Sequence, residues 1–214
     1  MVDYSLYLVA DVEYDPGRDV VTLIDAAVEG GVTVVQLRAK SLPFTTFLAL
    51  GRSVVPVLKR RRVPLIINDR ADVALSCGAA GLHLGQNDLP VAVARKILSE
   101  GMIIGVSVNT LEEAREAERQ GADYVGAGPV FETSTKVTDL PVIGPEGIRR
   151  LKDVLRIPVV AIGGITAANA REVRAAGADG IAVVSAVLGA SDPREAARHL
   201  KEEAATYRTQ GGCP

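Results

Sequence analysis

Leu65-Ile66-Ile67-Asn68-Asp69-Arg70 begins the stretch that decides the fold; residues 71–78 follow, and then Gly81-Leu82-His83-Leu84-Gly85-Gln86-Asn87-Asp88. An apolar run ends in polar residues, a short segment has the apolar spacing of a helix, and a second apolar run ends in polar residues. This pattern predicts a strand, a helix and a parallel strand. It places the hydrophilic side chains at the carboxyl end of each strand.

The same alternation extends over the whole chain. Further strands are predicted at 6–10, 32–37, 103–108, 124–128, 159–164 and 180–184, and helices at 20–29, 43–60, 91–100, 111–120, 146–154, 168–176 and 193–207. Thr110 followed by Glu113 is the capping-box pattern of a helix start. The alternation predicts an α/β fold, a (β/α)8 TIM barrel that forms a single domain over 1–214, with 209–214 as a frayed tail. A doubly wound open sheet is the alternative, but the sequence marks no switch point.

Composition and charge exclude several classes of protein. Hydrophobic residues make up 48% of the 214 residues and charged residues 23%, as in an ordinary globular protein. The net charge of −2 gives no reason to expect a nucleic acid or an anionic membrane as partner. Apolar runs are too short to span a bilayer, and the first residues lack the basic region of a secretory signal. Cys77 and Cys213 form no disulfide or metal pattern, so we expect a cytoplasmic protein.

Asp69 and Asp88 each follow a predicted strand, so both are expected at the same edge of the parallel sheet. Two carboxylates at one edge repel each other unless a cation lies between them. Oxygen ligands without His or Cys favour a hard ion such as Mg²⁺. The alternative is that each aspartate caps the helix that follows it.

The carboxyl ends of the strands form the active site of such barrels, and cationic residues gather there. Gln36, Arg38 and Lys40 lie two apart, so an extended chain directs them to the same side. Asn68, Ser107 and the loop residue Lys136 join them at this edge. Cationic groups for phosphate oxygens and carboxylates for an ion are what a metal-complexed polyphosphate needs. The alternative is that the cations pair with acidic neighbours inside the barrel.

The last two strands predict a second anion site. Gly163-Gly164 would let a ligand approach the backbone closely, and Ser185-Ala186 opens a short helical turn with outward amide groups. The Thr- and Ser-rich segment 131–144 is longer than an ordinary connection and carries Lys136 at its centre, which predicts a lid; an exposed loop is the alternative. His83 is compatible with a hydrogen-bonded core histidine or with a catalytic base.

Several motifs stand in a fixed order: Val35-Gln36-Leu37-Arg38-Ala39-Lys40, Ile67-Asn68-Asp69-Arg70, His83-Leu84-Gly85-Gln86-Asn87-Asp88-Leu89-Pro90, Ile104-Gly105-Val106-Ser107, Gly121-Ala122-Asp123-Tyr124-Val125-Gly126, Thr133-Ser134-Thr135-Lys136 and Ala161-Ile162-Gly163-Gly164-Ile165. With them the chain resembles the thiamine phosphate synthases (thiamine-phosphate pyrophosphorylases) along nearly its whole length. The resemblance implies a transferase of thiamine biosynthesis. Such enzymes couple 4-amino-2-methyl-5-hydroxymethylpyrimidine diphosphate with thiazole phosphate, giving thiamine phosphate and pyrophosphate with Mg²⁺ as cofactor.

The resemblance also implies roles for individual residues. It assigns the pyrimidine diphosphate to Gln36, Arg38, Lys40, Asn68, Ser107 and Lys136, Mg²⁺ to Asp69 and Asp88, and the thiazole phosphate to Thr133, Ser134, Thr135, Gly164, Val184 and Ser185. Lys136, Ser107 and Arg38 are the expected catalytic residues. The expected partners are these two small molecules, with neither nucleic acid nor membrane, and a homo-oligomer is left open.

Two positions depart from the family pattern. Ala39 stands where the family usually has an acidic residue, and Asn109 stands where many relatives have His. The sister family, the TenI-like thiazole tautomerases, shares the fold, uses a His at that position and tends to lose the metal-binding acids. Because Asp69 and Asp88 are both present, the synthase is predicted and the tautomerase is the alternative. A non-catalytic binding protein would require loss of these acids or of Lys136, and a phosphosugar isomerase would require a Glu or Lys base at a strand end.

Overall fold

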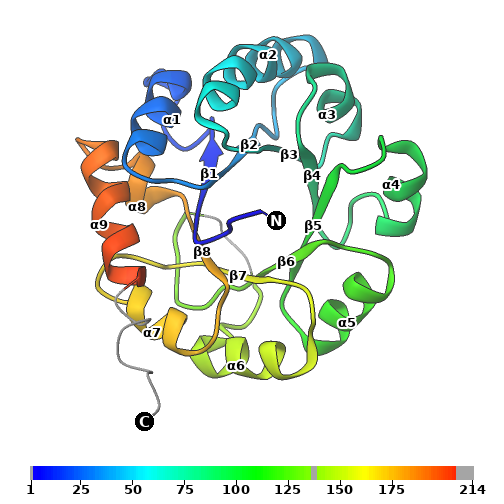
Figure 1. The fold of residues 1–214 in the computed structure, drawn as a ribbon, viewed down its shortest axis with the longest axis vertical. Helices are drawn as coiled ribbons and strands as arrows, with labels where there is room; N and C mark the ends of the chain where they lie inside the picture. The colour runs from blue at the N-terminus through cyan, green and yellow to red at the C-terminus, as the bar shows by residue number, and fades with distance from the viewer. Residues whose placement is uncertain (1, 136–138, 206–214) are drawn as a thin grey trace.

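The computed structural model describes residues 2–135 and 139–205, which form a closed parallel barrel surrounded by helices (Figure 1). The strands pair in sequence order: β1 (Leu6–Asp11), β2 (Val34–Arg38), β3 (Leu65–Asn68), β4 (Gly81–Leu84), β5 (Ile103–Val108), β6 (Tyr124–Ala127), β7 (Val159–Ile162) and β8 (Gly180–Val183). The helices are α1 (Val20–Glu29), α2 (Phe44–Arg61), α3 (Ala71–Cys77), α4 (Val91–Ile97), α5 (Leu111–Arg119), α6 (Gly144–Val154), α7 (Ala170–Ala175), α8 (Ser185–Leu188) and α9 (Pro193–Ala205). The predicted (β/α)8 TIM barrel is confirmed.

Most predicted elements differ from the observed ones by one or two residues at an end. The largest differences have local causes. The helix predicted at 91–100 ends at Ile97, because Leu98 is extended and turns its side chain into the core. The strand predicted at 159–164 ends at Ile162, because Gly163 and Gly164 have positive φ angles. The predicted tail 209–214 lies outside the residues that the structure describes.

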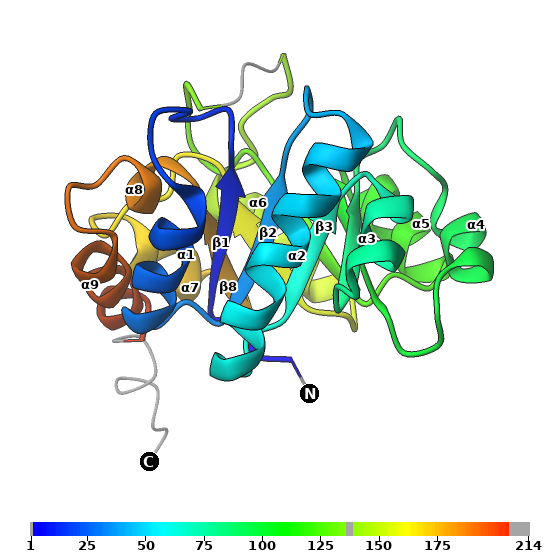
Figure 2. The ribbon, with the colours of Figure 1, turned by 90° about the horizontal axis from the view of Figure 1, so that it is seen from above.

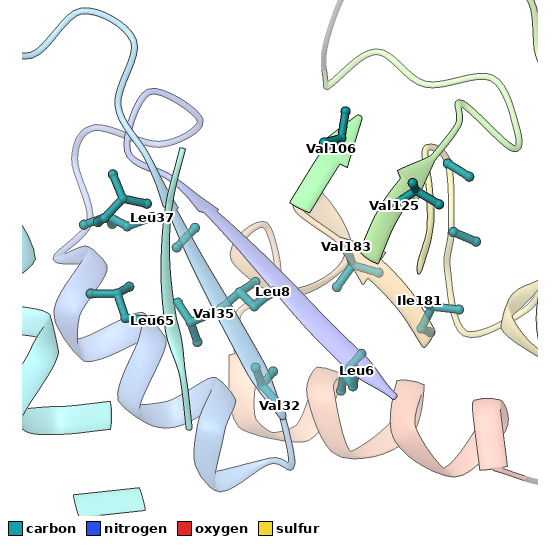
Figure 3. Packing of buried hydrophobic residues seen from close by; sticks show 14 of the residues in the cluster. Leu6, Leu8, Val32, Val35, Leu37, Leu65, Val106, Val125, Ile181 and Val183 are labelled. Carbon is teal, nitrogen blue, oxygen red and sulfur yellow. The ribbon is translucent and has the colours of Figure 1, made fainter. Parts of the chain in front are cut away.

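Alternating side chains along the strands divide the core into two layers. One set packs between the strands and the helices, and Figure 3 labels Leu8, Val35 and Val183 among its members. The other set fills the inside of the barrel, and it includes the rings of Tyr4, Tyr7 and Tyr124. The interior is therefore a packed core rather than a pore, and it contains polar phenol groups.

The loops after the strands rise from one rim of the barrel, toward which the β1 arrow points in Figure 2, and the N-terminal segment lies on the opposite side. This rim is where the predicted site residues were expected. In the part of the chain that the structure describes, no helix combines the length and apolarity that a membrane crossing requires.

The start of α5 has the predicted capping box. Thr110 accepts a hydrogen bond from the Glu113 amide at 3.1 Å, and the Glu113 carboxylate accepts one from the Thr110 amide at 3.2 Å. The same carboxylate accepts a bond of 2.6 Å from the Asn109 amide. The side chains of Thr110 and Glu113 thus accept hydrogen bonds from backbone amides at the helix start that have no partner within the helix.

Thr110→Ala should lower the free energy of unfolding by about 1 kcal/mol, because the side chain that accepts from the Glu113 amide is lost. Urea unfolding followed by circular dichroism measures the change. Thr110→Ser is the matched control, since it keeps the hydroxyl oxygen and should retain most of the stability. Equal losses in both variants would contradict a capping role.

Candidate active site

A cavity of about 560 Å³ opens at the carboxyl ends of the strands. Of the residues that the sequence assigned to substrate, the lining includes Gln36, Arg38, Asn68, Ser107, Thr133, Thr135, Gly164, Val184 and Ser185. Ser134 is exposed and Lys40 is half exposed, and neither lines the cavity. Lys136 lies outside the described residues, so its place in the site stays a prediction. The structure thus collects residues from distant segments around one cavity.

Asp69 stands directly after β3 in a tight turn. Its φ angle is +59°, its amide donates to the His83 carbonyl at 2.8 Å, and the Arg70 amide donates back to the Asn68 carbonyl at 2.7 Å. Left-handed backbone is uncommon outside glycine, although Asp tolerates it better than most residues, and such conformations cluster at functional sites. The turn directs the Asp69 carboxylate to Lys40, with which it forms an ion pair.

Asp88 lies beside Asp69 at the same rim, as predicted. One Asp88 carboxylate oxygen accepts a hydrogen bond of 2.7 Å from the Gly85 amide. The alternative that the two aspartates cap helices is wrong. The capping positions of α3 and α4 are Arg70 and Pro90, and neither helix start has a side-chain capping bond.

The two carboxyl groups lie close enough for each to shift the pKa of the other. Burial, followed by the hydrogen bond with Asp88, raises the pKa of Asp69 above its ordinary value. Burial also acts on Asp88, but its hydrogen bonds with Asp69 and the Gly85 amide lower its pKa overall. Asp69 is therefore the member that holds a proton more readily. In this structure the negative charge of the two aspartates is reduced by the Lys40 ammonium and by the raised pKa of Asp69. A divalent cation could balance the same charge, so these two carboxylates fit a hard metal ion.

The cations at the rim are paired with acids, as the alternative interpretation expected, but at the mouth of the barrel rather than deep inside it. Arg38 forms an ion pair with Asp11 and lies 3.8 Å from the Glu13 carboxylate. Gln36 and Arg38 share the cavity side of β2, whereas Lys40 lies beyond the end of that strand. Asp11 had the same sequence signal as Asp69, a carboxylate at the end of an apolar run, and was missed.

The floor of the cavity holds a chain of buried hydrogen bonds, the "floor chain", made by Gln36, Tyr7, Tyr124, His83 and Ser107. The Gln36 amide nitrogen lies 2.9 Å from the Tyr7 hydroxyl, which lies 2.7 Å from the Tyr124 hydroxyl. The latter lies 2.8 Å from His83 Nδ1, and His83 Nε2 lies 2.9 Å from Ser107 Oγ. His83 is thus a core histidine with both ring nitrogens hydrogen-bonded, the first of its two interpretations.

Tyr7 and Tyr124 were missed because they read as apolar strand residues. Both rings are fully buried, and burial raises the pKa of each phenol above its ordinary value. Both hydroxyl groups therefore stay protonated at neutral pH. Each keeps one hydrogen to donate and an oxygen that accepts.

The residues of the predicted second anion site line the same cavity, and anion binding there stays a prediction. The Thr135 hydroxyl donates to Ser185 Oγ at 3.2 Å, which joins the loop after β6 to the start of α8. The structure shows a further reason for Gly163-Gly164. A Cβ at Gly163 would lie 2.6 Å from Pro129 Cα, and one at Gly164 would lie 2.4 Å from the Glu132 carbonyl oxygen. Both glycines thus make room for the chain's own loop, and the close approach of a ligand to them stays a prediction.

Asn109, one of the two departures from the family pattern, holds the far end of the same loop. Its side-chain amide donates to the carbonyl oxygens of Gly128 and Pro141, both at 3.0 Å. Leu140, next to Pro141, is half exposed and lines the cavity. The loop is therefore attached on both sides of residues 136–138, at Thr135 and at Pro141.

Asp88→Asn should weaken Mg²⁺ binding in the presence of pyrophosphate by at least about tenfold, since even residues that only orient metal ligands cost this much. Isothermal titration calorimetry measures the affinity. The matched control is Asp72→Asn, which removes an acid that pairs with Arg70 on the neighbouring helix. If the two variants bind Mg²⁺ equally well, the carboxylate pair is not the metal site.

Comparison with known proteins gives one consistent result. A family model described as thiamine monophosphate synthase matches residues 6–187. The thiamine-phosphate synthase of Syntrophomonas wolfei is 48% identical over 200 residues, which cover 94% of this chain and 96% of that protein. That of Albidiferax ferrireducens is 49% identical over 197 residues, covering 92% and 90%. The solved thiamine phosphate pyrophosphorylase from Pyrococcus furiosus superposes with a TM-score of 0.88 at 43% identity, covering 96% and 97%.

Proposed function

The chain belongs to the thiamine monophosphate synthase family, and from this premise we propose that its cavity joins the pyrimidine diphosphate to thiazole phosphate and releases pyrophosphate. It is a transferase of thiamine biosynthesis. The observation that carries the proposal is a single cavity that is lined by Gln36, Arg38 and Ser107 and also by Thr135 and Ser185.

The tautomerase alternative is not favoured. The two acids that the sister family tends to lose are present and adjacent, at Asp69 and Asp88. The position at which that family uses a His for proton transfer is Asn109, whose amide is committed to two backbone carbonyl groups. An amide does not titrate near neutral pH, so it is a poor proton carrier.

Charge at the rim supports a diphosphate ligand. Arg38 would exchange its pairing with Asp11 for phosphate oxygens, and Lys40 would leave Asp69 in the same way. Mg²⁺ held by Asp69 and Asp88 would neutralise charge that accumulates on the departing pyrophosphate. Residues 2–135 and 139–205 contain no cluster of three or more His, Cys, Asp or Glu side chains suited to a metal. Asp69 and Asp88 are therefore the side chains that would hold the ion.

The proposed reaction begins with departure of pyrophosphate. The electron pair of the carbon–oxygen bond leaves with pyrophosphate, and the electron-rich aminopyrimidine carries the positive charge at its methylene carbon. The thiazole nitrogen then donates its lone pair to that carbon and forms the new bond. Arg38 and Lys136 stabilise the leaving group, and closure of the loop that carries Lys136 keeps out water that would otherwise trap the cation.

A cytoplasmic location stays a prediction, and the oligomeric state stays open. The substrates proposed here are small molecules, and the net charge of −2 supports neither nucleic acid nor an anionic membrane as partner. Sedimentation equilibrium of the purified chain tests the oligomeric state.

Pyrophosphate release is the first test of the function. Release should require pyrimidine diphosphate, thiazole phosphate and Mg²⁺ together, should stop in EDTA, and should match thiamine phosphate in amount. A coupled phosphate assay and chromatography measure the two products. Tautomerisation of the thiazole alone, without release of pyrophosphate, would overturn the proposal.

Lys136→Ala should lower the single-turnover rate by about 10²-fold, since it removes a cationic donor that is proposed to stabilise charge developing on the leaving group. Rapid-quench measurement at saturating substrates separates this step from binding and release. Lys136→Arg keeps the charge and should recover part of the rate. A near-normal rate for the alanine variant would remove Lys136 from the mechanism.

A further inference from the structure

The floor chain is a built feature of the barrel. Its side chains come from β2, β1, β6, β4 and β5, so it crosses the interior. Two glycines make room for it. A Cβ at Gly105 would lie 2.0 Å from the Tyr124 ring, and one at Gly126 would lie 3.2 Å from the His83 ring. Any larger residue at Gly105 would displace Tyr124, so the strand sequence is adapted to this chain of bonds.

Counting hydrogens fixes the direction of the floor chain. The Gln36 amide nitrogen donates to the Tyr7 oxygen, so the single hydroxyl hydrogen of Tyr7 goes to Tyr124. The hydrogen of Tyr124 then goes to His83 Nδ1. A neutral imidazole that accepts at Nδ1 carries its proton on Nε2, and that group donates to Ser107 Oγ.

The two ends of the floor chain are left with opposite polarity. Ser107 accepts from His83 and keeps its own hydroxyl hydrogen for a ligand in the cavity. Gln36 uses its amide nitrogen on Tyr7 and keeps its carbonyl oxygen as an acceptor. Both residues line the cavity, so a ligand meets one donor and one acceptor.

We propose that Tyr7, Tyr124 and His83 are positioning residues that select an aminopyrimidine over its oxo analogue, by holding Ser107 as a donor and Gln36 as an acceptor. This inference rests on the proposed function, because it concerns the pyrimidine substrate of the same site. An aminopyrimidine has an amino donor at C4 and, beside it, an unprotonated ring nitrogen that accepts, which suit the Gln36 oxygen and the Ser107 hydroxyl respectively. In the same arrangement the 4-oxo analogue would present a carbonyl oxygen to Gln36 and a ring N–H to Ser107, so both polarities would be mismatched. Sites that hydrogen-bond a substrate group reject analogues that lack it.

The tautomer of His83 tests the direction of the floor chain without any substrate. The chain contains two histidines, so ¹⁵N-histidine labelling gives two imidazole signals, which His83→Gln assigns. At a pH at which the imidazole is neutral, the long-range ¹H–¹⁵N spectrum of the wild type should show the proton of His83 on Nε2. A proton on Nδ1 would mean that the hydrogen bonds of the floor chain run in the opposite direction, and it would overturn the inference.

Binding of two unreactive ligands tests whether the direction of the floor chain determines which pyrimidine the site prefers. The monophosphates of the 4-amino and the 4-oxo pyrimidine do not carry the diphosphate leaving group, so their affinities report recognition alone. Calorimetry should show a preference for the amino compound in the wild type. Tyr124→Phe removes the hydroxyl that donates to His83, and it should reduce the preference by about tenfold or more.

Tyr4→Phe is the matched control, because the Tyr4 ring packs against Tyr124 with centroids 4.8 Å apart but its hydroxyl is outside the floor chain. It should leave the preference unchanged. An unchanged preference in Tyr124→Phe, or an equal loss in both variants, would overturn the positioning role. If His83 has the expected tautomer and the preference follows Tyr124 while no thiamine phosphate forms, the proposed function fails and the inference holds.

Discussion

A buried phenol hydroxyl without a hydrogen-bond partner would lower the stability of the fold by about 1–3 kcal/mol. The inside of this barrel holds two phenol hydroxyl groups, and they are hydrogen-bonded to each other. Tyr7 and Tyr124 are both shut off from solvent, so their partners must come from the surrounding strands. Gln36 and His83 are these partners, and the second ring nitrogen of His83 is in turn hydrogen-bonded to Ser107. The need to pair two phenols thus fixes side chains on five strands, all of which line the cavity.

A second constraint acts at the rim, where closure of a parallel barrel brings all strand ends together. Acids and bases from β1, β2 and the turns after β3 and β4 meet there, and their charges are balanced within the chain by ion pairs and by the raised pKa of Asp69. A diphosphate with a divalent cation brings both kinds of charge at once. Its phosphate oxygens would therefore pair with the cationic side chains and its cation with the carboxylates, in place of the internal ion pairs, and the net charge of the rim would change little.

The sequence predicts the barrel, the capping box at Thr110 and the adjacency of Asp69 and Asp88, because each depends on local patterns and on the common direction of parallel strands. It does not predict the floor chain. Parallel strands covered on both faces read as continuous apolar runs, so the pattern does not tell which side of β1 faces inward. Tyr7 therefore looks like any other core residue until closure places it against Tyr124. The further reason for Gly163-Gly164 was also hidden, since it lies in contacts with a loop more than thirty residues earlier.

Asn109 shows how the residue type at one position can determine its chemical role while the barrel stays the same. A His there can carry a proton, whereas the Asn109 amide donates two hydrogen bonds to backbone carbonyls and holds the loop end at Pro141. Its backbone amide is bound by Glu113, the same carboxylate that caps α5, so the loop is tied to a helix start. The reaction proposed above would need enclosure from water more than a proton carrier at this point. The Asn109 amide attaches the loop at Pro141 and does not titrate near neutral pH, and this favours the synthase over proton-transfer chemistry.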